Sequence, residues 1–139
     1  MKCEEPIAVL RQVYQMERRI VDLQNRIDAL HESATRTTGA YAAGRSSGAS
    51  DSRIETNVVK SIDLEKQLLR TRDRLLERRA AIQDAIDSME DEGAKRLIEL
   101  RYLDHMSWPD VMTSVELSEA ACFRLRNRAL KEFWKNFSK

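Results

Sequence analysis

Apolar residues recur every three or four positions over residues 4–33, and charged residues fill the positions between them. This period is typical of an amphipathic helix that buries a single stripe. Pro6 falls in the first turn, where proline is tolerated. The spacing therefore predicts a helix over 4–33. Its apolar stripe consists of Leu10, Val13, Ile20, Leu23, Ile27 and Leu30.

A second apolar stripe with heptad-like spacing covers residues 51–90 and predicts a longer helix. Two helices that each carry one apolar stripe should pair antiparallel, as in a coiled coil. Glu17, Glu65 and Arg72 interrupt the stripes, which indicates a fixed register or a further partner. We also expect the stripes to drive assembly into a homodimer or a larger oligomer. The second stripe consists of Ile54, Val58, Ile62, Leu68, Leu75, Ile82, Ile86 and Met89, and Leu69 and Leu76 widen it.

Residues 36–52 separate the two stripes and have a different composition. They include Gly39, Gly44 and Gly48, several Ser and Thr, and no aliphatic side chain larger than Ala. Such a segment buries too little surface to offset its ordering entropy, so we predict a flexible loop. Residues 1–91 are then expected to form one domain, a long antiparallel helical hairpin.

Residues 92–139 follow a break in the pattern at Asp91-Glu92-Gly93 and predict three short helices, over 94–104, 108–114 and 118–137. Ser107 and Ser118 each stand where a helix N-cap belongs. Two short helices, a tight link and a longer basic helix form the helix-turn-helix pattern. The whole chain is expected to be all-α, with this DNA-binding module at its C-terminal end.

The last predicted helix has two chemically different faces. Its core face should hold Cys122, Leu125, Ala129 and Phe133. Arg can form two hydrogen bonds with guanine, and Asn can do the same with adenine. Lys and Arg can also neutralise phosphates. Arg126 points toward the core side, and we expect it to pair with Glu99. The candidate DNA-binding residues are Ser118, Glu119, Ala120, Phe123, Arg124, Asn127, Arg128 and Lys131.

Residues 97–130 resemble the C-terminal module of phage RinA- and ArpU-type transcriptional regulators, a module similar to region four of sigma factors. The features that match are Arg101-Tyr102-Leu103, Ser107-Trp108 ahead of Val111, Ser118, and Phe123-Arg124-Leu125 followed by Ala129-Leu130. The resemblance implies a regulator encoded by a phage or prophage that acts on transcription of phage genes. The chain departs from the family at Glu116 and His105, where relatives commonly have Gly.

Charge is distributed unevenly, although the formal net charge is only +1. Residues 118–139 and 66–79 each carry six basic residues against two acidic ones, which indicates interaction surfaces. In the second segment Lys66, Arg70, Arg74 and Arg78 form one row on the predicted helix. We interpret this row as screened by Asp63, Asp73 and Glu77 through i, i+3 pairs. The alternatives are a second contact with the DNA backbone or a docking face for an acidic polymerase surface.

Other classes of function find little support in the sequence. Cys3 and Cys122 form neither a disulfide framework nor a metal-ligand pair, and His31 and His105 have the setting of surface and turn residues. No nucleophile signature or phosphate-binding Gly loop is present, so we expect no enzyme, no cofactor and no metal. No apolar run approaches the roughly 20 residues needed to span a bilayer, and no signal peptide is evident. A cytoplasmic protein of the bacterial host is expected.

These features predict a sequence-specific regulator that binds duplex DNA, with RNA polymerase as a candidate second partner. One alternative is a subunit like the phage small terminase, which couples a similar module to coiled-coil helices for genome packaging. Another is a coiled-coil adaptor whose basic C-terminus binds a protein and not DNA.

Overall fold

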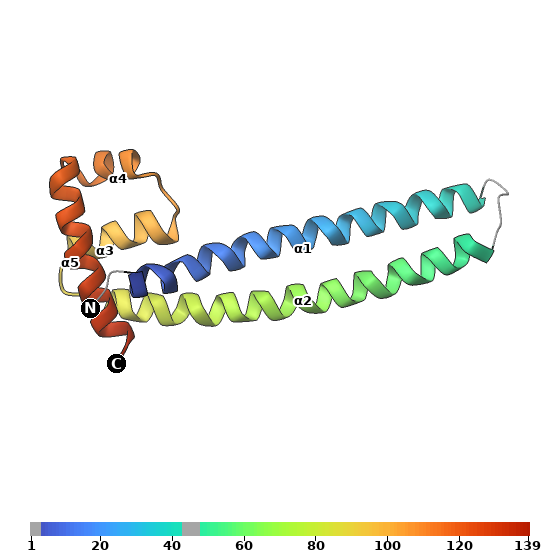
Figure 1. Ribbon diagram of the computed structural model, residues 1–139, viewed down its shortest axis with the longest axis horizontal. Helices are drawn as coiled ribbons and strands as arrows, with labels where there is room; N and C mark the ends of the chain where they lie inside the picture. Colours follow the sequence, from blue (N-terminus) through green and yellow to red (C-terminus); the bar gives the residue numbers. More distant parts are fainter. Residues whose placement is uncertain (1–3, 43–47) are drawn as a thin grey trace. The chain divides into compact units, whose positions relative to one another are not determined.

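The computed structural model describes residues 4–42 and 48–139, and within these ranges every regular element is helical. Two long helices come first, α1 (Glu4–Ala42) and α2 (Gly48–Asp87). They are followed by α3 (Glu92–Ile98), the π-helical segment η1 (Glu99–Leu103), α4 (Trp108–Val115) and α5 (Glu119–Phe137) (Figure 1). The predicted all-α class is confirmed.

The predicted loop over 36–52 is wrong at both of its ends. Helix α1 continues to Ala42 and α2 begins at Gly48, so helix covers 36–42 and 48–52. The rest of the predicted loop, 43–47, lies outside the described residues. Starting a helix is costly, but extending an existing one adds a hydrogen bond for each residue ordered. Ala40 and Ala42 favour such extension, because Ala has the highest helix propensity.

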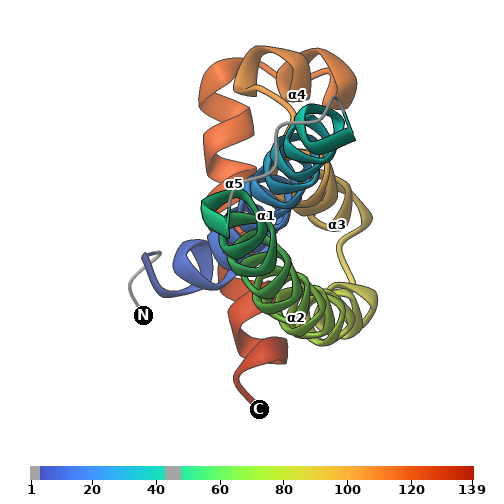
Figure 2. The ribbon, with the colours of Figure 1, turned by 90° about the vertical axis from the view of Figure 1, so that its right-hand side faces the viewer.

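One compact unit spans Glu17–Arg74 and contains the greater part of both long helices. Residues later in α1 contact residues earlier in α2. Arg19 contacts Gln67 at 3.5 Å, and Ser33 contacts Asn57 at 3.5 Å. The two helices therefore run antiparallel, as predicted (Figure 2). Leu23 and Ile27 are buried between them.

The α2 stripe is only partly buried. Leu75, Ile82, Ile86 and Met89 are core residues, whereas Val58, Ile62, Leu69 and Leu76 are exposed, Leu76 by 58%. The exposed residues Ile62, Leu69 and Leu76 repeat every seven positions, so they lie along one side of α2. The hairpin thus leaves an apolar row on α2 uncovered.

A second compact unit combines residues up to Met16 of α1 with Leu75–Lys139. The sequence placed a boundary at residue 91, but packing groups the adjoining ends of both long helices with the C-terminal helices. Hydrogen bonds contribute to this grouping: Asn136 Nδ2 donates to the Ala85 carbonyl at 3.1 Å, and the Glu90 amide donates to the Glu132 carboxylate. The core of this unit includes Leu10, Val13, Ile82, Ile86, Leu97, Ile98, Val111, Leu130 and Phe133.

Short-range interactions define the ends of the C-terminal helices. The Ser107 hydroxyl accepts from the Asp110 amide at 3.4 Å and caps α4, as predicted. The predicted 94–104 helix divides into α3 and η1, where the Asp104 amide bonds the Glu99 carbonyl five residues back. His105 and Glu116 have left-handed backbones with φ of 56° and 57°. Glycine adopts such backbones without strain, so a glycine would suit both positions.

Candidate nucleic-acid interface

Helix α5 starts at a capped N-terminus and buries one face. The Ser118 hydroxyl accepts from the Ala121 amide at 3.3 Å, which confirms Ser118 as the N-cap. The four residues expected on the core face are all buried: Cys122, Leu125, Ala129 and Phe133. Leu130 is buried as well. The orientation of α5 about its own axis is therefore the one that the sequence predicted.

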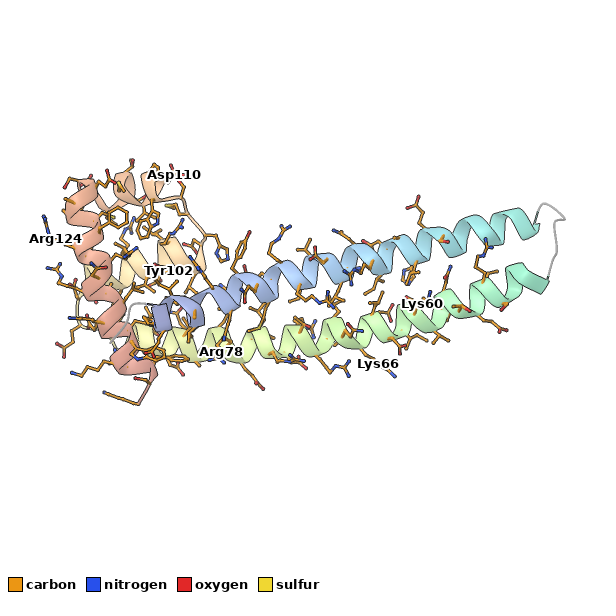
Figure 3. All side chains as sticks on the ribbon, in the orientation of Figure 1. Lys60, Lys66, Arg78, Tyr102, Asp110 and Arg124 are labelled. Carbon is orange, nitrogen blue, oxygen red and sulfur yellow. The ribbon has the colours of Figure 1, made fainter. Side chains whose placement is uncertain are left out.

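The eight candidate DNA-binding residues lie together on the α5 N-cap and the side of the helix away from this core. Phe123 is half-buried and the other seven are exposed. Arg124 projects away from α3 and α4 (Figure 3). Arg124, Arg128 and Lys131 are spaced four and three residues apart, so their side chains share one face. The exposed residues are Ser118, Glu119, Ala120, Arg124, Asn127, Arg128 and Lys131.

This face of α5 carries unneutralised positive charge. Within the described part of the chain, Arg124, Arg128 and Lys131 form no ion pair with a carboxylate. Glu119 is the one acidic residue of the eight, and it lies in the first turn, where the helix dipole favours an acid. Clustered cations on one exposed face produce a local positive potential that attracts anions.

Arg126 makes different contacts from the one predicted. Its guanidinium lies 5.3 Å from the ring centroid of Phe123 and 6.0 Å from that of Trp108, and it donates to Asn127 Oδ1. The predicted pair with Glu99 does not form among the described residues. A flat, weakly hydrated guanidinium stacks well on aromatic faces, which accounts for the preference. Arg126 thereby helps to position Phe123 and Asn127 on the candidate interface.

Behind the candidate interface, the buried thiol of Cys122 anchors α5 to the core. Burial raises the pKa of this thiol above its ordinary value of 9.0, and the positive charge of Arg126 acts in the opposite direction. The neutral thiol is therefore the form that fits the folded core. Cys122 is a structural residue of the candidate interface, as its position on the core face predicted.

The basic row on α2 lacks the screening that the sequence suggested. Lys66, Arg70 and Arg74 are exposed, and the described residues include no ion pair between this row and Asp63, Asp73 or Glu77. An exposed ion pair gains little free energy over two separately solvated charges, which explains why these side chains stay solvated and unpaired. Figure 3 shows Lys66 on the outer side of α2. Arg78 differs, because its guanidinium lies 5.7 Å from the Phe137 ring centroid.

A polar contact in the hairpin was missed by the sequence analysis. His31 was expected at a helix end, but α1 continues past it to Ala42. Its Nε2 lies 2.8 Å from the hydroxyl of the buried Ser61 and 3.7 Å from the Glu65 carboxylate. Ser61 occupies a position in the α2 stripe where an apolar residue would fit the heptad. That break in the pattern was the available signal.

The described residues include neither a metal-binding cluster nor a membrane-spanning helix. They contain no group of three or more His, Cys, Asp or Glu side chains that could hold a metal ion. None of their helices is both long and apolar enough to cross a bilayer.

The fold and its basic helical face define a small helical protein with a candidate nucleic-acid interface. The chain belongs to the family described as "Protein of unknown function (DUF1492)", whose model matches residues 39–133. This range includes α2, α3, α4 and most of α5. Comparison with curated proteins found no match, and comparison with solved structures found none either.

Proposed function

We propose that this chain is a sequence-specific regulator of transcription that binds duplex DNA, encoded by a phage or prophage and acting in the host cytosol. The strongest support is the exposed face of α5, which presents Arg124, Asn127, Arg128 and Lys131 opposite a fully buried face. A helix that is packed on one side and basic on the other can enter the major groove. Helix α4 and the left-handed turn at Glu116 precede it.

The exposed side chains divide naturally between base and backbone contacts. Arg124 lies between one and two turns into α5, where a recognition helix reaches base edges, and a guanidinium can fork onto guanine. Asn127 Oδ1 is engaged by Arg126, so its amide nitrogen is the group available to donate to a base. Arg128 and Lys131 lie further along the helix and suit phosphate contacts. The N-terminus of α5 at Ser118 offers backbone amides to a phosphate.

Self-association through the hairpin would strengthen binding to a repeated or palindromic site. A single module of this size buries modest DNA surface, and two linked modules raise both affinity and specificity. The exposed row of Ile62, Leu69 and Leu76 supports this step, because it offers apolar surface on a long helix. RNA polymerase is a candidate second partner, for which the basic row of α2 provides a surface.

The function can be tested by selecting preferred duplexes from a random library and measuring affinity at two salt concentrations. Arg124→Ala should cost about 1–3 kcal/mol on the selected duplex and relax its sequence preference. Lys131→Ala should weaken selected and scrambled duplexes alike and lower the salt slope by about one. Lys60→Ala, an exposed substitution on α2, is the matched control and should change neither quantity.

Two results would overturn this function. If no duplex is enriched and affinity does not depend on salt, the adaptor alternative is favoured. If Arg124→Ala binds both duplexes as the unmodified chain does, α5 is not a recognition helix. Mapping bound sites across a phage genome separates promoters from packaging sites, and thus transcription from a terminase-like role.

A further inference from the structure

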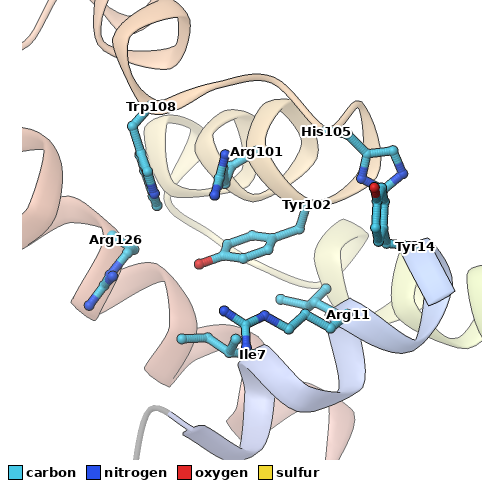
Figure 4. A pocket seen from close by; sticks show the side chains of 9 residues that line it. Ile7, Arg11, Tyr14, Arg101, Tyr102, His105, Trp108 and Arg126 are labelled. Carbon is cyan, nitrogen blue, oxygen red and sulfur yellow. The ribbon is translucent and has the colours of Figure 1, made fainter.

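A cavity of about 330 Å³ lies within the C-terminal compact unit, beside the first turns of α1. Its walls come from α1, η1, the residues that follow η1, α4 and α5 (Figure 4). The proposed DNA-binding function requires no ligand in this cavity, although Arg126, which lines it, also orients Asn127 on the exposed face of α5. Its volume is at the lower end of the range for small-ligand sites, roughly 300–1,000 Å³.

Three arginine side chains line this cavity, and each comes from a different part of the chain. Arg11 belongs to α1, Arg101 to η1 and Arg126 to α5 (Figure 4). Among the described residues no carboxylate lines the cavity, and none of the three arginines forms an ion pair. Like charges gathered in this way repel one another, and a bound anion would relieve the repulsion. Guanidinium groups in particular suit phosphate, which they can bind through paired hydrogen bonds.

Aromatic rings form much of the remaining wall. Tyr102 and Trp108 meet edge to face with ring centroids 6.5 Å apart, and Tyr14 and His105 do so at 5.0 Å. The Arg101 guanidinium lies 4.9 Å from the Trp108 ring centroid and also donates to the Met106 carbonyl at 2.9 Å. These contacts hold Arg101 and Trp108 in place. A planar ring could stack on such a wall, because aromatic pairs favour offset or edge contacts.

We propose that this cavity binds a small ligand that combines a planar ring with a phosphate group, of about the size of a nucleoside monophosphate. The cationic groups favour phosphate over carboxylate, because a phosphate monoester carries up to two negative charges and more acceptor oxygens. The aromatic wall selects for the ring. This binding requires no DNA, so it can be tested independently of the proposed regulatory function.

The binding test uses the full chain with Trp134→Phe, which leaves Trp108 as the single tryptophan and a fluorescence reporter within the cavity. The probes are the four ribonucleoside 5′-monophosphates. The corresponding nucleosides provide the ring alone, and inorganic phosphate provides the anion alone. We expect at least one monophosphate to quench Trp108 saturably, with a Kd at least about tenfold lower than that of its nucleoside or of inorganic phosphate. Titration calorimetry on the unmodified chain checks the same ranking.

Site-directed variants locate the binding. Arg11 is exposed, so Arg11→Gln should leave melting unchanged while weakening the monophosphate about tenfold, through loss of a charge-assisted hydrogen bond. Arg18→Gln, seven residues further along α1, is an exposed matched control and should bind as the parent does. The proposal is overturned if no monophosphate binds at millimolar concentration. It is also overturned if inorganic phosphate or the nucleoside alone binds equally tightly, or if Arg11→Gln behaves like Arg18→Gln.

Discussion

Arg126 donates to Oδ1 of the neighbouring Asn127 through both Nε, at 3.4 Å, and Nη2, at 3.2 Å. The contact orients an exposed amide on the face of α5 that we propose to read DNA. A free Asn can bind adenine through its oxygen and nitrogen together, but here the oxygen is engaged. Asn127 should therefore act as a donor toward a base acceptor for as long as Arg126 holds it.

This contact leads to a prediction about sequence preference. Arg126→Met retains an apolar side chain beside Phe123 and Trp108 but frees the Asn127 oxygen. The preferred base at the position read by Asn127 should change toward adenine, while binding to scrambled duplex weakens only modestly. Selection from a random library with each protein measures the change. If Asn127→Ala changes the preferred base but Arg126→Met does not, then Asn127 reads the base and its contact with Arg126 has no influence on which base is preferred.

Replacing Glu116 with glycine should stabilise the folded chain. Its φ of 57° is in the left-handed region, where a side chain costs about 1 kcal/mol and glycine avoids this cost. Glu116→Gly should raise the free energy of unfolding by up to about 1 kcal/mol, measured by urea denaturation. Ser114→Gly, within α4, is the control and should destabilise by roughly 0.5 kcal/mol, because glycine is a poor helix former. A loss of stability in Glu116→Gly would mean that the Glu116 side chain stabilises the turn by more than its strain.

Cys122 should make stability depend on pH in the alkaline range. Burial raises the pKa of its thiol in the folded chain, so the folded state holds this proton more tightly than the unfolded state. The resulting stabilisation is complete below the ordinary pKa of 9.0 and is lost as the pH rises through the folded-state pKa. Between about pH 8 and 10.5 the unmodified chain should therefore lose more free energy of unfolding than Cys122→Ala does. Equal losses in the two proteins would contradict the prediction, since the other titrating groups are shared.

Substitutions at two leucines on α2 should distinguish an effect on self-association from an effect on folding. Leu69 is exposed, so Leu69→Gln should weaken dimers or larger oligomers at micromolar concentration while leaving the helical content unchanged. Leu75 is buried, and Leu75→Ala should instead cost about 2–5 kcal/mol of folding free energy. Sedimentation and circular dichroism measure the two effects. A monomeric unmodified chain would contradict assembly through this row.

The helices, their caps and the buried face of α5 could be predicted from the sequence, because each depends on residues within a few positions of one another. Ser107 and Ser118 cap the helices that begin beside them. The periodic positions of Cys122 and Phe133 determine which face of α5 is buried. The eight candidate DNA-binding residues followed from the same local geometry. The limits of α1 and α2 were misjudged, because helix extension outweighed the loop-like composition, and the predicted 94–104 helix divides into α3 and η1.

Tertiary packing decided the features that join distant parts of the chain. It brings Ser61 to His31, and it gathers Arg11, Arg101 and Arg126 around one cavity. Periodicity indicates which face of a helix is apolar, but it does not specify which distant residue lies opposite a given side chain. That depends on the register of the hairpin and on how α3, α4 and α5 pack against the ends of α1 and α2. The sequence by itself therefore determined the helices and the face of α5, and only the folded chain brought the three arginines together.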